Sequence, residues 1–175
     1  MEGIVLLFNK LFASDDCADK DSYFCRQAVR AVVVHDDKLL LVHSNKGDYK
    51  FPGGGIEQGE SHSEALKREV LEETGYHVDR VNELIGITIE KRPDKFNHRK
   101  IFEMKSHYYL CDIESNQEGQ TLDDYEAEQE FEPVWITLDE ALATNQRLLE
   151  QYNNSMNSWA DREAYVMEEL SKARK

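Results

Sequence analysis

The stretch GGGIEQGESHSEALKREVLEETGY, Gly53 to Tyr76, joins a glycine-rich loop to a segment with strong helix signals. Ser61 and Glu64 have the spacing of a capping box, in which each side chain bonds the backbone of the other residue, so a helix should begin near His62. Gly75 supplies the left-handed residue that commonly ends a helix. The sequence therefore predicts a helix with a defined start and end directly after a flexible loop.

Glu69, Glu72 and Glu73 fall on one side of this predicted helix at 100° per residue. Neighbouring carboxylates on a helix repel each other by about 0.2–0.5 kcal/mol per pair, and the dipole of the last turn also disfavours anions. One interpretation is a solvated charged face, in which Arg68 pairs with Glu72. The other is a magnesium site, because hard divalent cations prefer several carboxylate oxygens. The glutamates alone do not decide between the two.

The spacing of the whole stretch decides between them. Gly54, Glu60 and the run from Arg68 to Tyr76 resemble the Nudix box, which is a glycine, five residues, Glu, seven residues, then Arg-Glu-aliphatic-any-Glu-Glu-any-Gly-apolar. Every constrained position is met, although Tyr76 is a less typical last residue. Chance agreement is on the order of one in 10⁷ per chain at average residue frequencies. The chain thus resembles the Nudix hydrolase (MutT-like) family from Arg26 onward.

The resemblance implies an α/β fold, a Nudix-type α/β/α sandwich with a mixed β-sheet. The interspersed but not strictly alternating strand and helix patterns also favour a mixed sheet with helices on its faces. Residues 1–25 are expected to form an N-terminal strand and connection packed on the domain, and residues 26–175 the Nudix hydrolase domain. The expected elements are strands at 3–8, 30–34, 39–43, 81–90 and 101–113, a strand and helix within 131–143, and a closing helix at 158–172.

The resemblance also implies a metal site. Its expected ligands are the carboxylates of Glu69, Glu72 and Glu73 and the carbonyl oxygen of Gly53. Glu69 and Glu73 are the expected catalytic residues, and Glu69 is expected to orient or deprotonate the attacking water. The expected cofactor is Mg²⁺, for which Mn²⁺ can substitute.

Other residues of the resemblance are expected to support the site. They are Gly54, Glu60, Arg68 and Gly75, and Arg68 is expected to clamp Glu60 so that the loop stays against the helix. The family often takes a further acidic ligand or base from outside the box. The acidic loop from Asp123 to Glu132 is expected to supply it here, with Glu128 or Glu130 as the expected residue.

The implied function is hydrolysis of the diphosphate linkage of a nucleoside diphosphate linked to another moiety. A diphosphate is shielded from nucleophiles by its own charge, and divalent ions neutralise that charge. The main alternative is a non-hydrolysing Nudix domain that senses a nucleotide, although such sensors commonly lose box glutamates. Isoprenoid diphosphate isomerisation on the same fold and a purely structural acidic domain are the remaining alternatives.

The clues to the substrate come from basic and aromatic residues. The segment KRPDKFNHRK, residues 91–100, is a basic island in an acidic chain, and Lys91, Arg92 and Lys95 are its expected substrate-binding residues. The other interpretation of this island is a solvated hairpin tip. Three aromatic residues either stack a nucleobase or pack in the core: Tyr49, Phe51 and Trp135.

Composition limits the partners. The 175 residues carry a formal net charge of −14, which argues against duplex nucleic acid and anionic membranes as partners and leaves a small nucleotide diphosphate as the expected one. A homodimer is left open. Three cysteines without metal-ligand spacing are interpreted as reduced thiols of a cytoplasmic protein: Cys17, Cys25 and Cys111. The short apolar run at 3–8 is interpreted as a strand and not as a signal peptide.

Overall fold

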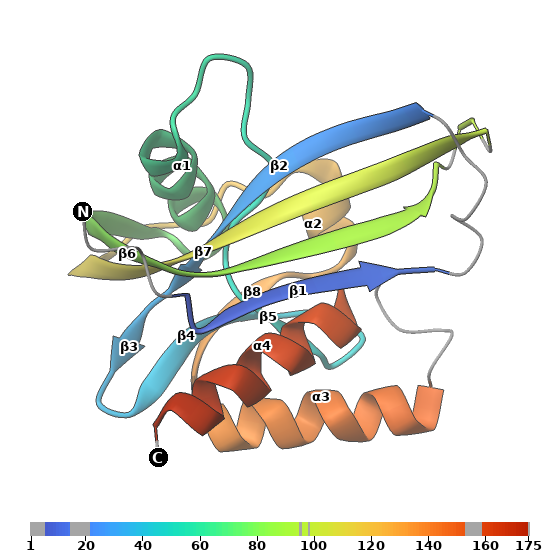
Figure 1. Ribbon diagram of the computed structural model, residues 1–175. Helices are drawn as coiled ribbons and strands as arrows, with labels where there is room; N and C mark the ends of the chain where they lie inside the picture. Colours follow the sequence, from blue (N-terminus) through green and yellow to red (C-terminus); the bar gives the residue numbers. More distant parts are fainter. Residues whose placement is uncertain (1–5, 15–21, 95, 98, 153–158, 175) are drawn as a thin grey trace.

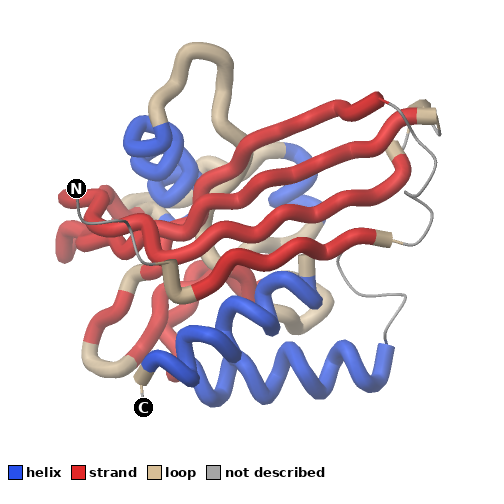
Figure 2. The backbone as a smooth tube through the Cα atoms, in the orientation of Figure 1, coloured by secondary structure: helices blue, strands red, loops and turns tan. Residues whose placement is uncertain are grey.

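The computed structural model describes residues 6–14, 22–94, 96–97, 99–152 and 159–174. Two sheets form the centre of the molecule. Helix α1 covers one side, and helices α3 and α4 cover the other, so that strands lie between helices (Figures 1 and 2). The α/β class that the sequence predicts is confirmed.

The first sheet is mixed, as predicted. Its strand order is β1 (Phe8–Ala13), β6 (Tyr76–Pro93), β7 (Lys100–Gln117) and β2 (Ser22–Val32). The pairs β1–β6 and β2–β7 are parallel, whereas β6–β7 is an antiparallel hairpin. Four register shifts interrupt the β6–β7 ladder near its Tyr76 end. Such bulges bend and twist a sheet locally.

The second sheet is antiparallel and was not predicted as a separate sheet. Its central strand β4 (Lys38–His43) pairs with β3 (Val34–His35), β5 (Tyr49–Lys50) and β8 (Glu132–Thr137). The chain passes from the first sheet to the second directly after β2. The two sheets therefore share one core on the side of α3 and α4 and another beneath α1.

Four helices complete the described fold: α1 (His62–Thr74), α2 (Asp124–Glu128), α3 (Leu138–Tyr152) and α4 (Ala160–Ala173). Helix α1 packs against β2 and β6, while α3 and α4 pack against each other and against strands of both sheets. The closing helix predicted at 158–172 corresponds to α4, whereas α2 was not predicted. None of the described helices is both long enough and apolar enough to span a lipid bilayer.

Several predicted strand boundaries were wrong. The strand expected at 3–8 is found at Phe8–Ala13, and residues 1–5 lie outside the described part of the chain. Residues 22–25, expected in the connection, belong to β2. Both strands of the β6–β7 hairpin extend beyond the predicted 81–90 and 101–113. Periodicity marks only the buried part of a strand, whereas backbone pairing continues through polar residues that face solvent.

The two ends of α1 follow the prediction. Ser61 Oγ accepts a hydrogen bond from the Glu64 amide at 3.2 Å, and Glu64 Oε2 accepts one from the Ser61 amide at 2.8 Å. Gly75 has a φ of 74° and donates to the carbonyl of Leu71. The apolar side of α1, which includes the fully buried Leu66, packs into the core. These contacts fix the rotation of the helix and turn its glutamates towards the glycine loop.

Candidate metal centre

A pocket of about 630 Å³ lies between the glycine loop, α1 and α2. Its walls carry both signs of charge. The acidic residues include Glu69, Glu72, Glu73 and Glu126, and the basic ones include Arg26, Arg30 and Lys50. A pocket of this size is within the range of small-molecule sites. Positive side chains in the wall provide local positive charge in a chain whose net charge is −14.

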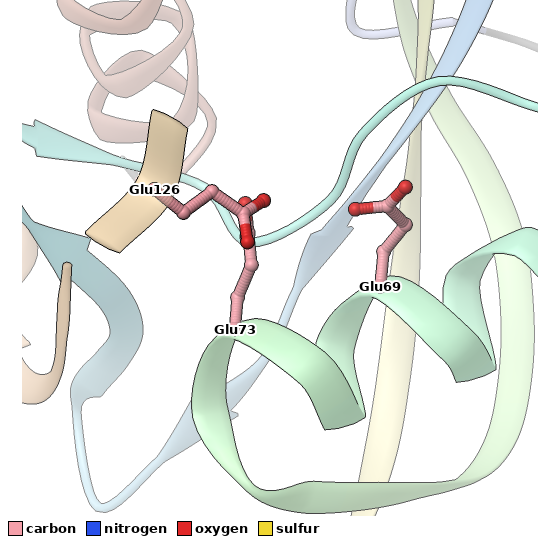
Figure 3. A group of neighbouring side chains, drawn as sticks. All are labelled: Glu69, Glu73 and Glu126. Atoms are coloured by element: carbon pink, nitrogen blue, oxygen red, sulfur yellow. The ribbon is translucent and has the colours of Figure 1, made fainter. Parts of the chain in front are cut away.

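Three carboxylates converge in this pocket. Glu69, Glu73 and Glu126 each offer an oxygen, and these oxygens lie within 4.8 Å of one another. Glu69 and Glu73 come from successive turns of α1 and are 7% and 1% exposed. Glu126 comes from α2, and Figure 3 shows its carboxylate meeting that of Glu73. Two elements far apart in the sequence therefore supply one group of oxygen donors.

Basic and backbone groups hold the carboxylates of α1 in place. Glu73 accepts from Lys50 Nζ at 2.5 Å with one oxygen and from the Gly53 amide at 2.8 Å with the other. Glu69 accepts from Arg68 Nη1 at 2.7 Å. Burial raises the pKa of Glu69, and it raises the pKa of Glu126 to about 7. Negative charge is thus costly at this position, and a bound cation would offset that cost.

The glycines of the loop allow a close approach to α1. An ideal Cβ on Gly54 would lie 2.4–2.6 Å from the carboxylate atoms of Glu69, and one on Gly53 would lie 2.1 Å from the carbonyl oxygen of Val29. Gly53 also has a backbone φ of 137°, which residues with a side chain rarely adopt. Its carbonyl oxygen, the expected metal ligand, accepts a hydrogen bond from Arg30 Nη1.

Arg68 ties the loop to the helix. Its Nε and Nη2 each donate to one carboxylate oxygen of Glu60, both at 2.9 Å, and Nη2 also donates to the carbonyl of Gly55 at 3.1 Å. Its Nη1 reaches Glu69 and, at 3.3 Å, Glu72. The hydrogen bond from Arg68 is the main cause that lowers the pKa of Glu60. A forked, bidentate pair of this kind fixes orientation as well as charge.

Replacement of Arg68 by alanine is expected to destabilise the fold by about 2 kcal/mol, because its side chain and that of Glu60 are only 26% and 14% exposed. For a chain of this length the loss corresponds to roughly 4–8 °C in Tm. Thermal unfolding of Arg68→Ala measures it, with Lys67→Ala on the exposed neighbouring position as the control. Equal Tm values for the two variants would contradict a role of Arg68 in holding the loop.

The expected acidic residues separate into two groups in the structure. Glu72 lines the pocket, but its side chain is 39% exposed and lies outside the group of three converging carboxylates. Glu128 and Glu130 are exposed and are not among the described residues that line the pocket. Glu126, from the same acidic loop, lies in the pocket with Glu69 and Glu73 instead.

A capping signal could have pointed to Glu126. Asp123 and Glu126 form a second capping box, in which Asp123 Oδ1 accepts from the Glu126 amide at 2.7 Å and Glu126 Oε2 accepts from the Asp123 amide at 3.0 Å. The spacing equals that of Ser61 and Glu64, which the sequence does reveal. It predicts a short helix, although it does not predict that this helix faces α1.

The expected substrate-binding residues lie away from the carboxylates. Lys91 forms an ion pair with Glu103 at 3.1 Å, and the guanidinium of Arg92 lies 4.9 Å from the ring centre of Phe102. Neither lines the carboxylate pocket, and Lys95 lies outside the described residues.

The aromatic residues named from the sequence also lie elsewhere. Phe51 is fully buried in the core, Tyr49 packs on the same core, and Trp135 donates to the hydroxyl of Tyr76 at 3.2 Å. The aromatic residues that line the pocket were not predicted: Tyr125, Phe131 and Trp159. They come from α2 and from residues next to β8 and α4, which no local pattern connects to the box.

Two curated proteins are similar to part of the chain. An ADP-ribose pyrophosphatase of Methanocaldococcus jannaschii is 36% identical over 75 residues, which are 41% of this chain and 44% of that protein. A MutT-like protein of Streptomyces ambofaciens is 40% identical over 62 residues, 34% of this chain and 40% of that protein. The chain thus spans less than half the length of these curated relatives.

Solved structures and a family profile extend the comparison. A NUDIX hydrolase from Nitrosomonas europaea is 24% identical with a TM-score of 0.49, over 75% of this chain and 90% of that one. The profile of the NUDIX domain matches residues 26–159, well over half of the chain, and includes the loop, α1 and α2. On the strength of that match, the chain belongs to the Nudix family.

Proposed function

We propose that this protein is a hydrolase that requires a divalent metal ion and cleaves the diphosphate linkage of a nucleoside diphosphate linked to another moiety. The observation that carries the proposal is the convergence of Glu69, Glu73 and Glu126 within 4.8 Å, in a pocket that also contains positive side chains. A curated relative is named an ADP-ribose pyrophosphatase, and its substrate is of this class.

The residues present fit a hard divalent cation. Their donors are carboxylate oxygens, two of them on nearly buried side chains, and Mg²⁺ and Mn²⁺ prefer such oxygens. Glu69, Glu73 and Glu126 would hold the ion, and Glu72 and the carbonyl of Gly53 are proposed as further ligands. When bound, the ion would neutralise the charge of the diphosphate and acidify the attacking water.

The chain's own groups would then carry out the remaining tasks. Glu69, oriented by Arg68, would accept a proton from the water while the water oxygen attacks phosphorus and the bridging phosphorus–oxygen bond breaks. Glu73, held by Lys50 and the Gly53 amide, would assist Glu69 in this step. Both products would be phosphates.

The glycine at position 54 should matter for turnover more than for stability. A Cβ at Gly54 would meet the end of the Glu69 side chain, which can move aside, so the fold should tolerate alanine while Glu69 is displaced. A displacement near 1 Å can cost about 10²-fold in rate. We expect Gly54→Ala to lose about that factor in kcat with little change in Tm. Gly119→Ala is the control, because a Cβ there would meet nothing within 4 Å. Similar kcat values for both variants would contradict the required approach.

A hydrolysis screen tests the function. The substrates are nucleoside triphosphates, nucleotide sugars, ADP-ribose, dinucleoside polyphosphates and capped RNA, each with Mg²⁺, with Mn²⁺ and with chelator. Metal-dependent release of a phosphate-containing product from at least one of them is expected. Nucleotide binding without turnover of any would instead support the sensing alternative.

We also propose how the N-terminal segment packs and where in the cell the protein is located. The described part of the N-terminal segment is proposed to pack on the domain that follows it, since β1 pairs with β6 and Phe8 is 4% exposed in the shared core. Cytoplasmic location is proposed because Cys25 is exposed and forms no disulfide with the described residues, and a reducing compartment preserves such thiols.

A further inference from the structure

A second cavity of about 320 Å³ adjoins the carboxylate pocket. The two cavities share three wall residues: Arg30, Tyr125 and Trp159. We call the second cavity the aromatic groove, and its further walls include Arg92, Phe102 and Met104. Tyr125 precedes Glu126 in α2, so one short helix contributes to both cavities. The groove is therefore adjacent to the carboxylate pocket.

Arg30 stands at the junction with an unused donor. Its side chain is 8% exposed, its Nη1 donates to the carbonyl of Gly53, and its buried Nε has no hydrogen-bond partner among the described residues. An unsatisfied buried donor is unfavourable, and on a cationic group the cost is greater. The Arg30 side chain lines both cavities, and a phosphate oxygen placed between them is the natural partner of its guanidinium.

The other arginines of the groove differ in what they offer a ligand. Arg162 is 4% exposed, and its nitrogens donate to Glu163 at 2.6 and 3.0 Å and to Glu90, so its charge is already balanced. Arg92 is exposed and lies over the ring of Phe102. The groove therefore presents limited positive charge for a long polyphosphate tail.

Aromatic side chains form the rest of the surface. Trp159 is held by a 2.9 Å hydrogen bond from Nε1 to Asp48, and Tyr125 meets it edge to face, with ring centres 6.2 Å apart. Phe102 lies on the strand β7 and carries the guanidinium of Arg92. Nucleobases stack on aromatic rings and on guanidinium planes regardless of their identity. A nucleotide needs aromatic rings for its base and a hydrogen-bond donor for its phosphate. The rings of the groove and the guanidinium of Arg30 supply both.

We propose that the aromatic groove binds the nucleoside of the substrate, with its base against Phe102, Tyr125 and Trp159, and that the guanidinium of Arg30 donates to the phosphate that joins this nucleoside to the scissile linkage. The inference rests on the proposed function, because it assigns the orientation of the substrate in the same site. It places the leaving moiety on the opposite side of the carboxylates.

Binding of nucleoside monophosphates tests the groove without any hydrolysis. Trp159 and Trp135 are the two tryptophans of the chain, so Trp135→Phe leaves Trp159 as the single fluorescent reporter. Titration with AMP, GMP, CMP and UMP in Mg²⁺ buffer should quench the fluorescence of Trp159. Ribose 5-phosphate should bind at least about 5-fold more weakly than these nucleotides. The expected ratio follows from base stacking on aromatic side chains, which contributes about 5- to 150-fold.

Two tyrosines of equal exposure provide the matched variants. Tyr125 is 50% exposed in the groove, and Tyr23 is 51% exposed on β2 outside it. Tyr125→Leu should weaken monophosphate binding by about 5-fold or more, whereas Tyr23→Leu should leave it unchanged. On the hydrolysed substrate, Tyr125→Leu should raise KM by a similar factor with kcat largely retained, the pattern of lost uniform binding.

The outcomes separate the inference from the function. If a substrate is turned over but Tyr125→Leu behaves like Tyr23→Leu, or if ribose 5-phosphate binds as well as the nucleotides, the groove does not bind the base and the inference is overturned. If monophosphates bind in a Tyr125-dependent manner but nothing is hydrolysed, the groove is supported and the proposed hydrolysis fails. Absence of monophosphate binding to the parent protein at millimolar concentration also overturns the inference.

Discussion

Removal of divalent cations is expected to abolish hydrolysis and to lower the Tm of the protein by roughly 5–10 °C relative to the Mg²⁺-saturated state. Three carboxylates within 4.8 Å repel one another without a cation, and two of them are nearly buried. An ion that binds only the folded state at 100 times its Kd adds about 2.7 kcal/mol of stability. Differential scanning fluorimetry with Mg²⁺ and with chelator measures the shift, and the hydrolysis assay measures the activity.

Neighbouring glutamates on α2 allow a matched control for this effect. Glu126 belongs to the carboxylate group, whereas Glu128 is exposed two residues away. Glu126→Gln should reduce the metal-induced rise in Tm and raise the Mg²⁺ concentration that is needed for half-maximal activity. Glu128→Gln should behave as the parent protein. If Glu128→Gln shows the loss and Glu126→Gln does not, the acidic residue outside the box has been assigned incorrectly.

Full activity in excess chelator would rule out the metal-dependent mechanism. An unchanged Tm with intact activity would have a narrower meaning, namely that the ion binds only together with substrate. The phosphates would then supply the missing ligands, since Mg²⁺ commonly bridges protein carboxylates and substrate phosphates.

Local signals in the sequence predicted the parts of the site that local contacts build. The helix α1, its capping box at Ser61 and its end at Gly75 depend on residues within four positions of each other, and all three predictions are confirmed. The pairing of Arg68 with Glu60 also spans only eight residues, but it was expected from the resemblance to the Nudix box and not from a local signal. For the start and the end of α1 the chemistry of the individual side chains is sufficient information.

Residues brought in from distant segments could not be predicted in this way. Glu126 and Tyr125 reach the site because α2 folds across the end of α1, and no periodicity in the acidic loop encodes that approach. The glutamates of α1 show the same limit at finer scale. Glu72 and Glu73 are adjacent in the box, yet their side chains are 39% and 1% exposed, because a rotation of 100° along the helix separates the pocket rim from the packed interior.

The two sheets illustrate the same distinction. The apolar runs at 30–34, 39–43, 81–90 and 101–113 predicted that strands exist there, but not that β2 continues in one sheet while β3 pairs in the other. Sheet order depends on long-range pairing, which a single sequence does not express. The position of the glycine loop depends on this sheet arrangement, since the carbonyl of Gly54 accepts a hydrogen bond from the amide of Val29 in β2.

Replacement of Glu69 by glutamine is expected to lower kcat by about three orders of magnitude while substrate affinity changes much less. Glutamine keeps the shape of the side chain and one oxygen for the metal, but it removes a charge and the basic site. Loss of a general base typically costs roughly 10²–10⁴-fold. A weaker hold on the metal ion should move the loss towards the upper end of that range. Glu73 and Glu126 remain to hold most of the metal charge, so the substrate should still bind.

Steady-state turnover and calorimetric binding of a non-hydrolysable diphosphate analogue measure the two expectations for Glu69→Gln, with Glu83→Gln on the exposed part of β6 as the control. Arg68 can still donate to the amide oxygen of glutamine, so the loop should remain in place and Tm should change little. Turnover like that of the parent protein would remove Glu69 from the proton transfer, and the base would then be sought at Glu126, whose carboxylate lies in the same group. If the parent protein binds the analogue but turns nothing over and Glu69→Gln alters affinity alone, the pocket senses a nucleotide and does not cleave it.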